Sequence, residues 1–195
     1  IKYSNKKSNM PKDLCYLQGK YKEDYLHDMK ICQEYAILNR QTMAKNIVEK
    51  VINPMLNTKL NLNDLEQFQT VHNYLNFEDN IIRKGAVSAK KGEKLIIPIN
   101  MRDGSLICIG KGNEDWNNSA PHGAGRIMSR SRAKQLVNME EYKQSMKEIY
   151  TTSVSESTMD EAPMVYKPLE EIESNIKDTA DIVERIKPIY NFKAN

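Results

Sequence analysis

The chain has 195 residues, of which 39% are hydrophobic, and 29 Lys and Arg against 26 Asp and Glu leave a formal net charge of +3. No run of about 18 apolar residues occurs, which excludes a membrane-spanning helix, and no charged segment precedes an apolar run, which excludes a recognisable secretory signal. Mixed charges and widely spread hydrophobic residues predict a folded chain rather than a disordered one.

The first part of the chain predicts a polar lead-in over residues 1–20 and then one long helix. Apolar side chains recur near helical spacing between residues 21 and 52, and Pro54 is expected to end that helix. Residues 55–82 predict shorter elements of secondary structure around His72. His27, inside the long helix, is interpreted as structural.

The middle of the chain predicts strands and the last third predicts helices. Short apolar runs bounded by Gly and Pro favour strands within residues 83–111. The elements expected after them are a loop over 110–125, a helix from Arg126 to Met139, a polar connection over 151–163, an acidic amphipathic helix over 168–187 and a last strand at Tyr190–Lys193. This order favours an α+β fold, with residues 1–195 as a single unit.

The cysteines give no disulfide framework. Cys15, Cys32 and Cys108 are far apart and odd in number, and no CxxC pair occurs. We expect three buried thiols in a reduced intracellular protein, with a cytoplasmic location.

The most unusual stretch is the loop that begins at His122, because three small residues follow this histidine. Small residues let backbone N–H groups approach a phosphate closely, and the positive end of the helix expected next would point to the same place. The cations that follow are Arg126, Arg130, Arg132 and Lys134, with no acid among them. The loop therefore predicts a nucleotide or nucleic-acid phosphate site with a histidine nucleophile. The alternative is a tight glycine turn before a solvated basic helix.

Two histidine and arginine motifs upstream are further candidates. His72 and Asn73 lie among apolar neighbours, where an imidazole either binds a metal or is an ordinary core residue. Arg83 and Lys84 precede Gly85, an arrangement that suits phosphate contacts and also suits a hairpin turn.

The last candidate stretch pairs two acids with a tyrosine. Asp160 and Glu161 come shortly before Tyr166, whose ring could stack on a base. Paired acids are also usual near the N-terminus of a helix, which is the alternative interpretation.

These motifs together resemble the RtcB family of RNA-splicing ligases. The resemblance rests on HNY at His72–Tyr74, RKGA at Arg83–Ala86, HGAGRIMSR at His122–Arg130, DEAPMVYK at Asp160–Lys167 and a lysine near the end of the chain, Lys193. Residues 27–40 are also similar to the segment upstream of HNY in that family. The resemblance implies an RtcB-like fold, with packed mixed sheets and flanking helices around a nucleotide cleft.

The activity that the resemblance implies is GTP- and manganese-dependent RNA ligation, in RNA repair or tRNA splicing. Such ligases join a 2′,3′-cyclic phosphate or 3′-phosphate RNA end to a 5′-hydroxyl end, and His122 matches the histidine that carries GMP. His72 matches a manganese ligand. Residues that match the guanylate site are His72, Asn73, Pro98, Ile99, Asn100, Met101, Ser105, His122, Gly123, Ala124, Gly125, Tyr166 and Lys193. Residues expected to hold RNA phosphates are Arg83, Lys84, Arg126 and Arg130. The expected partners are GTP and RNA with broken ends, without a membrane; the sequence does not identify an activating protein partner.

The sequence departs from the family pattern in two ways. Where the family has PGSMG, this chain has PINMR at Pro98–Arg102, and Ile99 cannot adopt positive φ cheaply, which argues against the usual close approach of the backbone. The Asp…Cys, Asn-His and HTGSR-like motifs that supply the family's other metal ligands do not occur. We therefore expect the chain to be the C-terminal portion of a divergent bacterial or phage RNA-repair ligase, beginning at Ile1 after most of the metal site.

Two expectations and two alternatives follow from these departures. Alone, this chain is expected to bind manganese poorly and to form no GMP adduct. One alternative is a non-catalytic RNA-binding or interaction module that retains the ligase fold. The other is a phosphoryl-transfer enzyme of a different kind that works through a phosphohistidine.

Overall fold

The computed structural model describes residues 15–193, which divide into two compact units between Gln67 and Phe68. The expectation of one unit over the whole chain stays a prediction. None of the helices formed by the described residues combines the length and the apolar character that a bilayer crossing requires.

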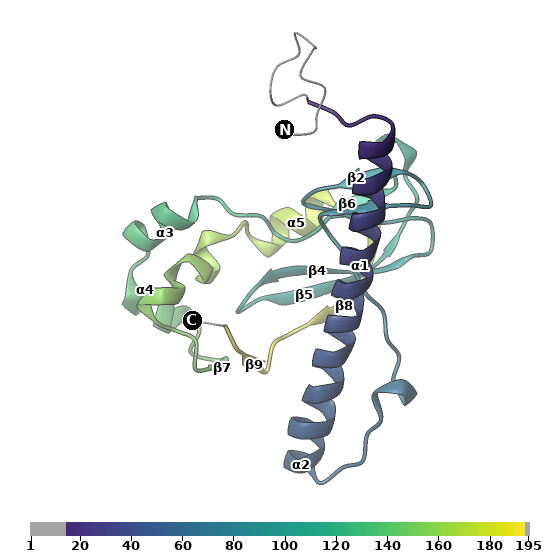
Figure 1. The fold of residues 1–195 in the computed structure, drawn as a ribbon. Coiled ribbons are helices and arrows are strands. Elements are labelled where there is room, and N and C mark those ends of the chain that lie inside the picture. Colours follow the sequence, from purple (N-terminus) through teal and green to yellow (C-terminus); the bar gives the residue numbers. More distant parts are fainter. Residues whose placement is uncertain (1–14, 194–195) are drawn as a thin grey trace. The chain divides into compact units, whose positions relative to one another are not determined.

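The first unit is built on one long helix. α1 spans Lys20–Ile47, continues through a π-helical turn at Val48–Ile52 and ends in α2 at Asn53–Leu56 (Figure 1). Pro54 lies in the first turn of α2, where a helix does not need its N–H, so the helical path ends slightly later than expected. Asn57 adopts a left-handed conformation there, with φ of 50°. A 3-10 turn follows at Leu62–Asp64.

The thiols do not all lie in a core. Cys108 is buried, whereas Cys15 and Cys32 are exposed. Cys32 belongs to α1, a helix in which no residue is buried. The expectation of three buried thiols is therefore wrong for two of them.

The second unit contains four small sheets (Figure 1). The largest is antiparallel and consists of β4 (Lys94–Asn100), β5 (Gly104–Gly110) and β8 (Ala180–Ile186), with β5 in the centre. The two-stranded sheets are β1 (Tyr74–Asn76) with β2 (Ile81–Arg83), β3 (Ala86–Ser88) with β6 (Ser119–Pro121), and the parallel pair β7 (Tyr150–Thr151) with β9 (Tyr190–Asn191). The α+β class is confirmed.

Short helices connect these sheets. They are α3 (Arg130–Leu136), α4 (Met139–Ser145) and α5 (Leu169–Asn175), with 3-10 turns at Glu114–Trp116, Glu156–Glu161 and Pro163–Val165. The helix predicted from Arg126 begins only at Arg130, because Arg126 forms an isolated β-bridge with Tyr166. The helix predicted over 168–187 is wrong in its second half, because Ala180–Ile186 pair with β5 as strand β8.

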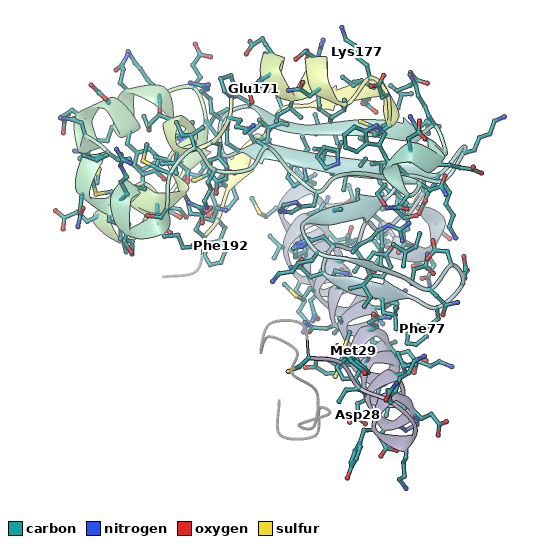
Figure 2. All side chains as sticks on the ribbon, turned by 90° about the horizontal axis from the view of Figure 1, so that it is seen from above. Asp28, Met29, Phe77, Glu171, Lys177 and Phe192 are labelled. Carbon is teal, nitrogen blue, oxygen red and sulfur yellow. The ribbon has the colours of Figure 1, made fainter. Side chains whose placement is uncertain are left out.

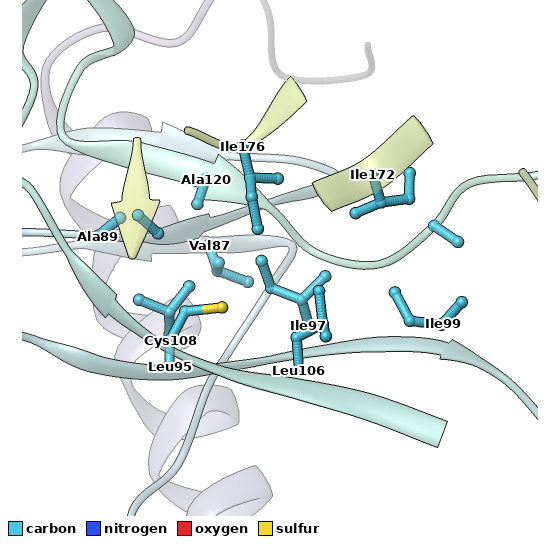
Figure 3. Packing of buried hydrophobic residues seen from close by; sticks show 12 residues of the cluster. Val87, Ala89, Leu95, Ile97, Ile99, Leu106, Cys108, Ala120, Ile172 and Ile176 are labelled. Carbon is cyan, nitrogen blue, oxygen red and sulfur yellow. The ribbon is translucent and has the colours of Figure 1, made fainter. Parts of the chain in front are cut away.

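Two buried clusters position the loops of this unit. In the first, alternate residues of β4, namely Leu95, Ile97 and Ile99, pack with β5 and with α5 (Figure 3). The α5 helix and the residue after it bury Ile172 and Ile176 there, while the charged side chains of Glu171 and, just beyond the helix, Lys177 lie on the outer side (Figure 2).

The second cluster surrounds the fully buried ring of Tyr142 on α4. Its hydroxyl donates a hydrogen bond to the sulfur of Met101, 3.3 Å away. Because Ile99 belongs to the first cluster and Met101 to the second, the segment that follows β4 is fixed from both sides.

Candidate functional site

An open pocket of about 820 Å³ lies in the second unit. This volume falls in the range that small-molecule sites occupy. All but Asn73 of the residues matched to a guanylate site line it: His72, Pro98, Ile99, Asn100, Met101, Ser105, His122, Gly123, Ala124, Gly125, Tyr166 and Lys193. Arg126, Arg130 and Glu161 line it as well. The structure thus brings together segments that are far apart in the sequence.

His122 is placed by the pairing of two short strands. Ala86 of β3 lies opposite Pro121 of β6, so Gly85 and His122 are neighbours. The Nδ1 atom of His122 lies 2.6 Å from the carbonyl oxygen of Gly85. A carbonyl oxygen only accepts, so Nδ1 carries the proton and Nε2 retains its lone pair. The ring of His72 lies beside it, with 4.8 Å between the ring centroids.

Asn73 lies outside the pocket wall but contacts the same glycine. Its Oδ1 accepts a hydrogen bond from the backbone N–H of Gly85 at 2.8 Å. Both residues have positive φ, 60° for Asn73 and 69° for Gly85. Asn73 is therefore linked to His122 through the backbone of Gly85.

The first small residue after His122, Gly123, serves close packing of the chain. A Cβ atom on Gly123 would lie 3.0 Å from the carbonyl oxygen of Pro98. The N–H of Ala124 donates to that same carbonyl at 3.1 Å. The N–H of Ala124 is thus already used inside the protein and is not available to a phosphate in this arrangement.

The divergent segment Pro98–Arg102 avoids the strain expected at Ile99. Ile99 continues β4 with its side chain buried, and only residues further on make the turn. The Oδ1 of Asn100 accepts from the N–H groups of Arg102 and Asp103, and Gly104 takes the positive φ of 77°. A Cβ atom at Gly104 would collide with the carbonyl oxygen of Ile186, so this position requires glycine.

Glu161 was noted in the sequence only as one of a pair of acids, and the structure places it at the centre of the pocket's polar contacts. Its Oε1 accepts from Arg126 at 2.6 Å and from Arg130 at 3.2 Å. Its Oε2 accepts from the hydroxyl of Tyr166 at 2.7 Å and from Lys193 at 3.2 Å. The available signal was that the matched motifs contain this acid together with two arginines, a tyrosine and a lysine. The sequence does not show that one carboxylate contacts all four of these groups.

The surroundings of Glu161 change the acidity of two groups. Burial by itself raises the pKa of the Glu161 carboxyl, but hydrogen bonds from Tyr166 and Lys193 and the charge of Arg126 outweigh burial and lower this pKa below its ordinary value. Burial and the neighbouring carboxylate raise the pKa of Tyr166, so its hydroxyl stays protonated and donates. The guanidinium of Arg126 lies 4.8 Å from the centre of the Tyr166 ring.

The end of the chain is fixed so that Lys193 reaches this carboxylate. β9 pairs with β7, and the side-chain amide of Asn191 donates to the carbonyl oxygen of Met101 at 2.7 Å. The N–H of Lys193 donates to the hydroxyl of Ser153 at 2.8 Å. These bonds place the lysine on the pocket wall.

Of the four residues expected to hold RNA phosphates, Arg83 is engaged inside the protein. Its side chain is 1% exposed and pairs with Asp79 at 3.2 Å. It also donates to the hydroxyl of Ser119 and to the carbonyl oxygen of Asn117. In this arrangement the guanidinium joins the β1–β2 hairpin to the start of β6 and is not presented to RNA. Lys84 is exposed, and the side chain of Arg130 is 67% exposed while it pairs with Asp160.

Replacing Arg83 with alanine is expected to lower the free energy of unfolding by about 2 kcal/mol, because hydrogen bonds to a charged group are lost and Asp79 loses one of its partners. Lys84→Ala is the matched control and is expected to change stability by no more than about 0.5 kcal/mol. Urea unfolding of both variants measures this difference. An Arg83→Ala variant as stable as the parent would contradict the structural role.

The residues present do not by themselves fit a manganese ion. Within residues 15–193 no group of three or more His, Cys, Asp or Glu side chains is arranged to hold a metal. His72, the residue matched to a manganese ligand, has His122 as its ring neighbour. One or two imidazoles are fewer ligands than a manganese ion takes up in proteins.

Comparison with known proteins gives a consistent family. A family model described as "tRNA-splicing ligase RtcB" matches residues 2–194. RNA-splicing ligase RtcB1 and RNA-splicing ligase RtcB, from two Escherichia coli strains, are 35% and 33% identical over 188 residues, which cover 91% of this chain and 46% of each relative. A tRNA-splicing ligase RtcB of Nanoarchaeum equitans is 28% identical over 198 residues, 86% of this chain and 41% of the relative. The chain spans about half the length of the curated relatives it matches.

Proposed function

The chain belongs to the RtcB family, and we propose that it is the part of a GTP-dependent RNA ligase that carries the nucleotide. The proposed ligase joins an RNA 2′,3′-cyclic phosphate or 3′-phosphate end to a 5′-hydroxyl end. The observation that supports this proposal most directly is His122, which lines the pocket with Nδ1 bound to a carbonyl and Nε2 left with its lone pair.

The proposed first step is attack by His122 on GTP. Nε2 forms a bond to the α-phosphorus, the bond from that phosphorus to the bridging oxygen breaks, and pyrophosphate leaves. The imidazole then carries a positive charge, which the carbonyl oxygen of Gly85 stabilises through the Nδ1 proton. The GMP next passes to the RNA 3′-phosphate, and the 5′-hydroxyl displaces it to close the new phosphodiester.

The other residues of the pocket are proposed to bind and orient. Tyr166 and Lys193 both donate a hydrogen bond to Oε2 of Glu161. They are proposed to hold the guanine and ribose end of the nucleotide. Arg126 and Arg130 are proposed to hold RNA phosphates, as is the exposed Lys84. Arg130 is the best placed of these cations, because most of its side chain is accessible while one guanidinium nitrogen stays paired.

Manganese is part of the proposed chemistry only with further ligands. We propose that His72 contributes one imidazole and that the remaining ligands come from outside residues 15–193. For this reason the chain alone is expected to bind manganese poorly and to remain inactive.

The test is covalent labelling with GTP that carries a radioactive α-phosphate, in the presence of manganese, followed by a denaturing gel. The chain alone is expected to stay unlabelled. A protein in which this chain replaces the matching half of the Escherichia coli K12 relative is expected to become labelled, and the unaltered relative is the control. Label on the chain alone would contradict the need for outside ligands. A folded, RNA-binding but unlabelled chimaera would favour the non-catalytic module.

A further inference from the structure

The hydrogen bonds around Gly85 give Asn73 a role that its place outside the pocket wall does not suggest. We propose that Asn73 is a positioning residue that fixes the tautomer of His122: it holds the backbone of Gly85, and the carbonyl of Gly85 holds the proton on Nδ1 of His122. The tautomer itself requires no nucleotide. Its value for catalysis rests on the proposed function, because only this tautomer leaves Nε2 able to attack.

The first step of the argument is where Gly85 lies. Tyr74 of β1 is paired with Arg83 of β2, and one residue beyond Gly85 the chain enters β3, which pairs with β6. Gly85 therefore connects the β1–β2 hairpin to the β3–β6 sheet and belongs to neither ladder. Without a further bond its two backbone dihedrals would be poorly fixed, since glycine has more conformational freedom than other residues.

The second step is what holds Gly85. The bond from its N–H to Oδ1 of Asn73, at 2.8 Å, connects it to the residue directly before β1. This bond closes the open end of the β1–β2 hairpin one position beyond its last pair. The carbonyl of the same glycine then lies 2.6 Å from Nδ1 of His122. One side chain thus holds the N–H of the same glycine whose carbonyl group meets the imidazole, so it restrains the backbone dihedrals that aim this carbonyl.

The third step concerns the imidazole. A neutral histidine has one protonated nitrogen, and the partner of that nitrogen decides which one it is. Free imidazole side chains in water favour the proton on Nε2, the opposite of what a nucleophilic Nε2 requires. A well-placed carbonyl at Nδ1 reverses this preference, and a carbonyl that moves away does not.

The test uses the chain labelled with nitrogen-15 in its histidine rings, at a pH well above the ordinary pKa of histidine. The ring nitrogen shifts report which nitrogen carries the proton, and His122→Ala assigns the signals. The parent chain is expected to show His122 with the proton on Nδ1. Asn73→Gly removes the acceptor without straining a position of positive φ, and it is expected to shift the tautomer ratio toward Nε2–H by about fivefold, the effect of one ordinary hydrogen bond.

Two further variants separate this role from general loss of structure. Asn73→Asp keeps an acceptor and tolerates positive φ, so it is expected to restore the Nδ1–H tautomer. Asn80→Gly removes another exposed asparagine of positive φ, at the other end of the same hairpin, and is expected to leave His122 unchanged. An Asn73→Gly chain with the tautomer of the parent, or a parent with the proton on Nε2, would overturn the proposal. A chain that shows the expected tautomers but whose chimaera never carries GMP would refute the proposed function and support the role of Asn73.

Discussion

Replacing His122 with alanine is expected to abolish covalent GMP attachment in the chimaera with the Escherichia coli relative. The loss should reach roughly 10⁴-fold or more, the size seen when a nucleophile is removed from an enzyme. The physical reason is that alanine has no lone pair to form the bond to phosphorus. Labelling with radioactive GTP and manganese, followed by a denaturing gel, measures the loss down to the background signal of the gel.

The fold should survive this change, which makes the result interpretable. The His122 ring is partly exposed and hydrogen-bonds to a backbone carbonyl. The free energy of unfolding should therefore change by no more than about 1 kcal/mol. His27→Ala is the matched control, because it removes an exposed imidazole from α1, and it should label like the parent. Label that persists in His122→Ala and disappears in His72→Ala would assign the nucleophile to His72 instead.

The regular elements were predictable where the chain repeats its apolar residues with a clear period. The long helix ending near Pro54 and the strands of residues 83–111 follow from such patterns. The prediction of a helix over 168–187 was wrong in its second half, because the apolar residues there fit both the helical and the strand period. Residues 180–186 form strand β8, with Ala180 and Ile182 facing the first buried cluster, because β5, about 70 residues earlier, offers a free edge for pairing.

The candidate site was predictable in its members but not in their contacts. The motifs name almost every residue of the pocket wall, yet the sequence cannot show which polar groups are satisfied inside the protein. Arg83 illustrates this limit: its partners Asn117 and Ser119 lie 34 and 36 residues away, so burial of its guanidinium was invisible in the RKGA motif. Likewise, the sequence does not reveal that Gly123 is small because it packs on the carbonyl of Pro98.

Glu161 shows the same limit with a larger energetic consequence. Its side chain is 18% exposed and accepts hydrogen bonds from groups on three separate parts of the second unit. Arg126 comes from the loop after β6, Tyr166 from the segment before α5, and Lys193 from the end of the chain. Because these partners line the pocket, the carboxylate fixes the arrangement that is proposed to receive the nucleotide.

Glu161→Gln is therefore expected to lower the free energy of unfolding at pH 7 by about 3 kcal/mol, because an amide offers one acceptor oxygen where the carboxylate offers two and removes the counter-charge that Glu161 gives to Arg126 and Lys193. The sign of the pH dependence follows from the lowered pKa of this carboxyl in the folded chain. A lowered pKa adds stability above the ordinary value of about 4.3, and this stability is lost as the pH falls through the folded value.

The difference between the parent and Glu161→Gln should thus be constant from neutral pH down to about pH 5 and shrink at lower pH, once the parent carboxyl also becomes neutral. Urea unfolding at pH 7 and near pH 3 measures the constant difference at neutral pH and its decrease in acid. Glu140→Gln is the matched control, because its side chain is 82% exposed and pairs with Lys143 in the same helix, so it should change the free energy of unfolding by no more than about 0.5 kcal/mol at either pH. A loss that persists undiminished near pH 3 would show that the shape of the Glu161 side chain, and not its charge, stabilises the pocket wall.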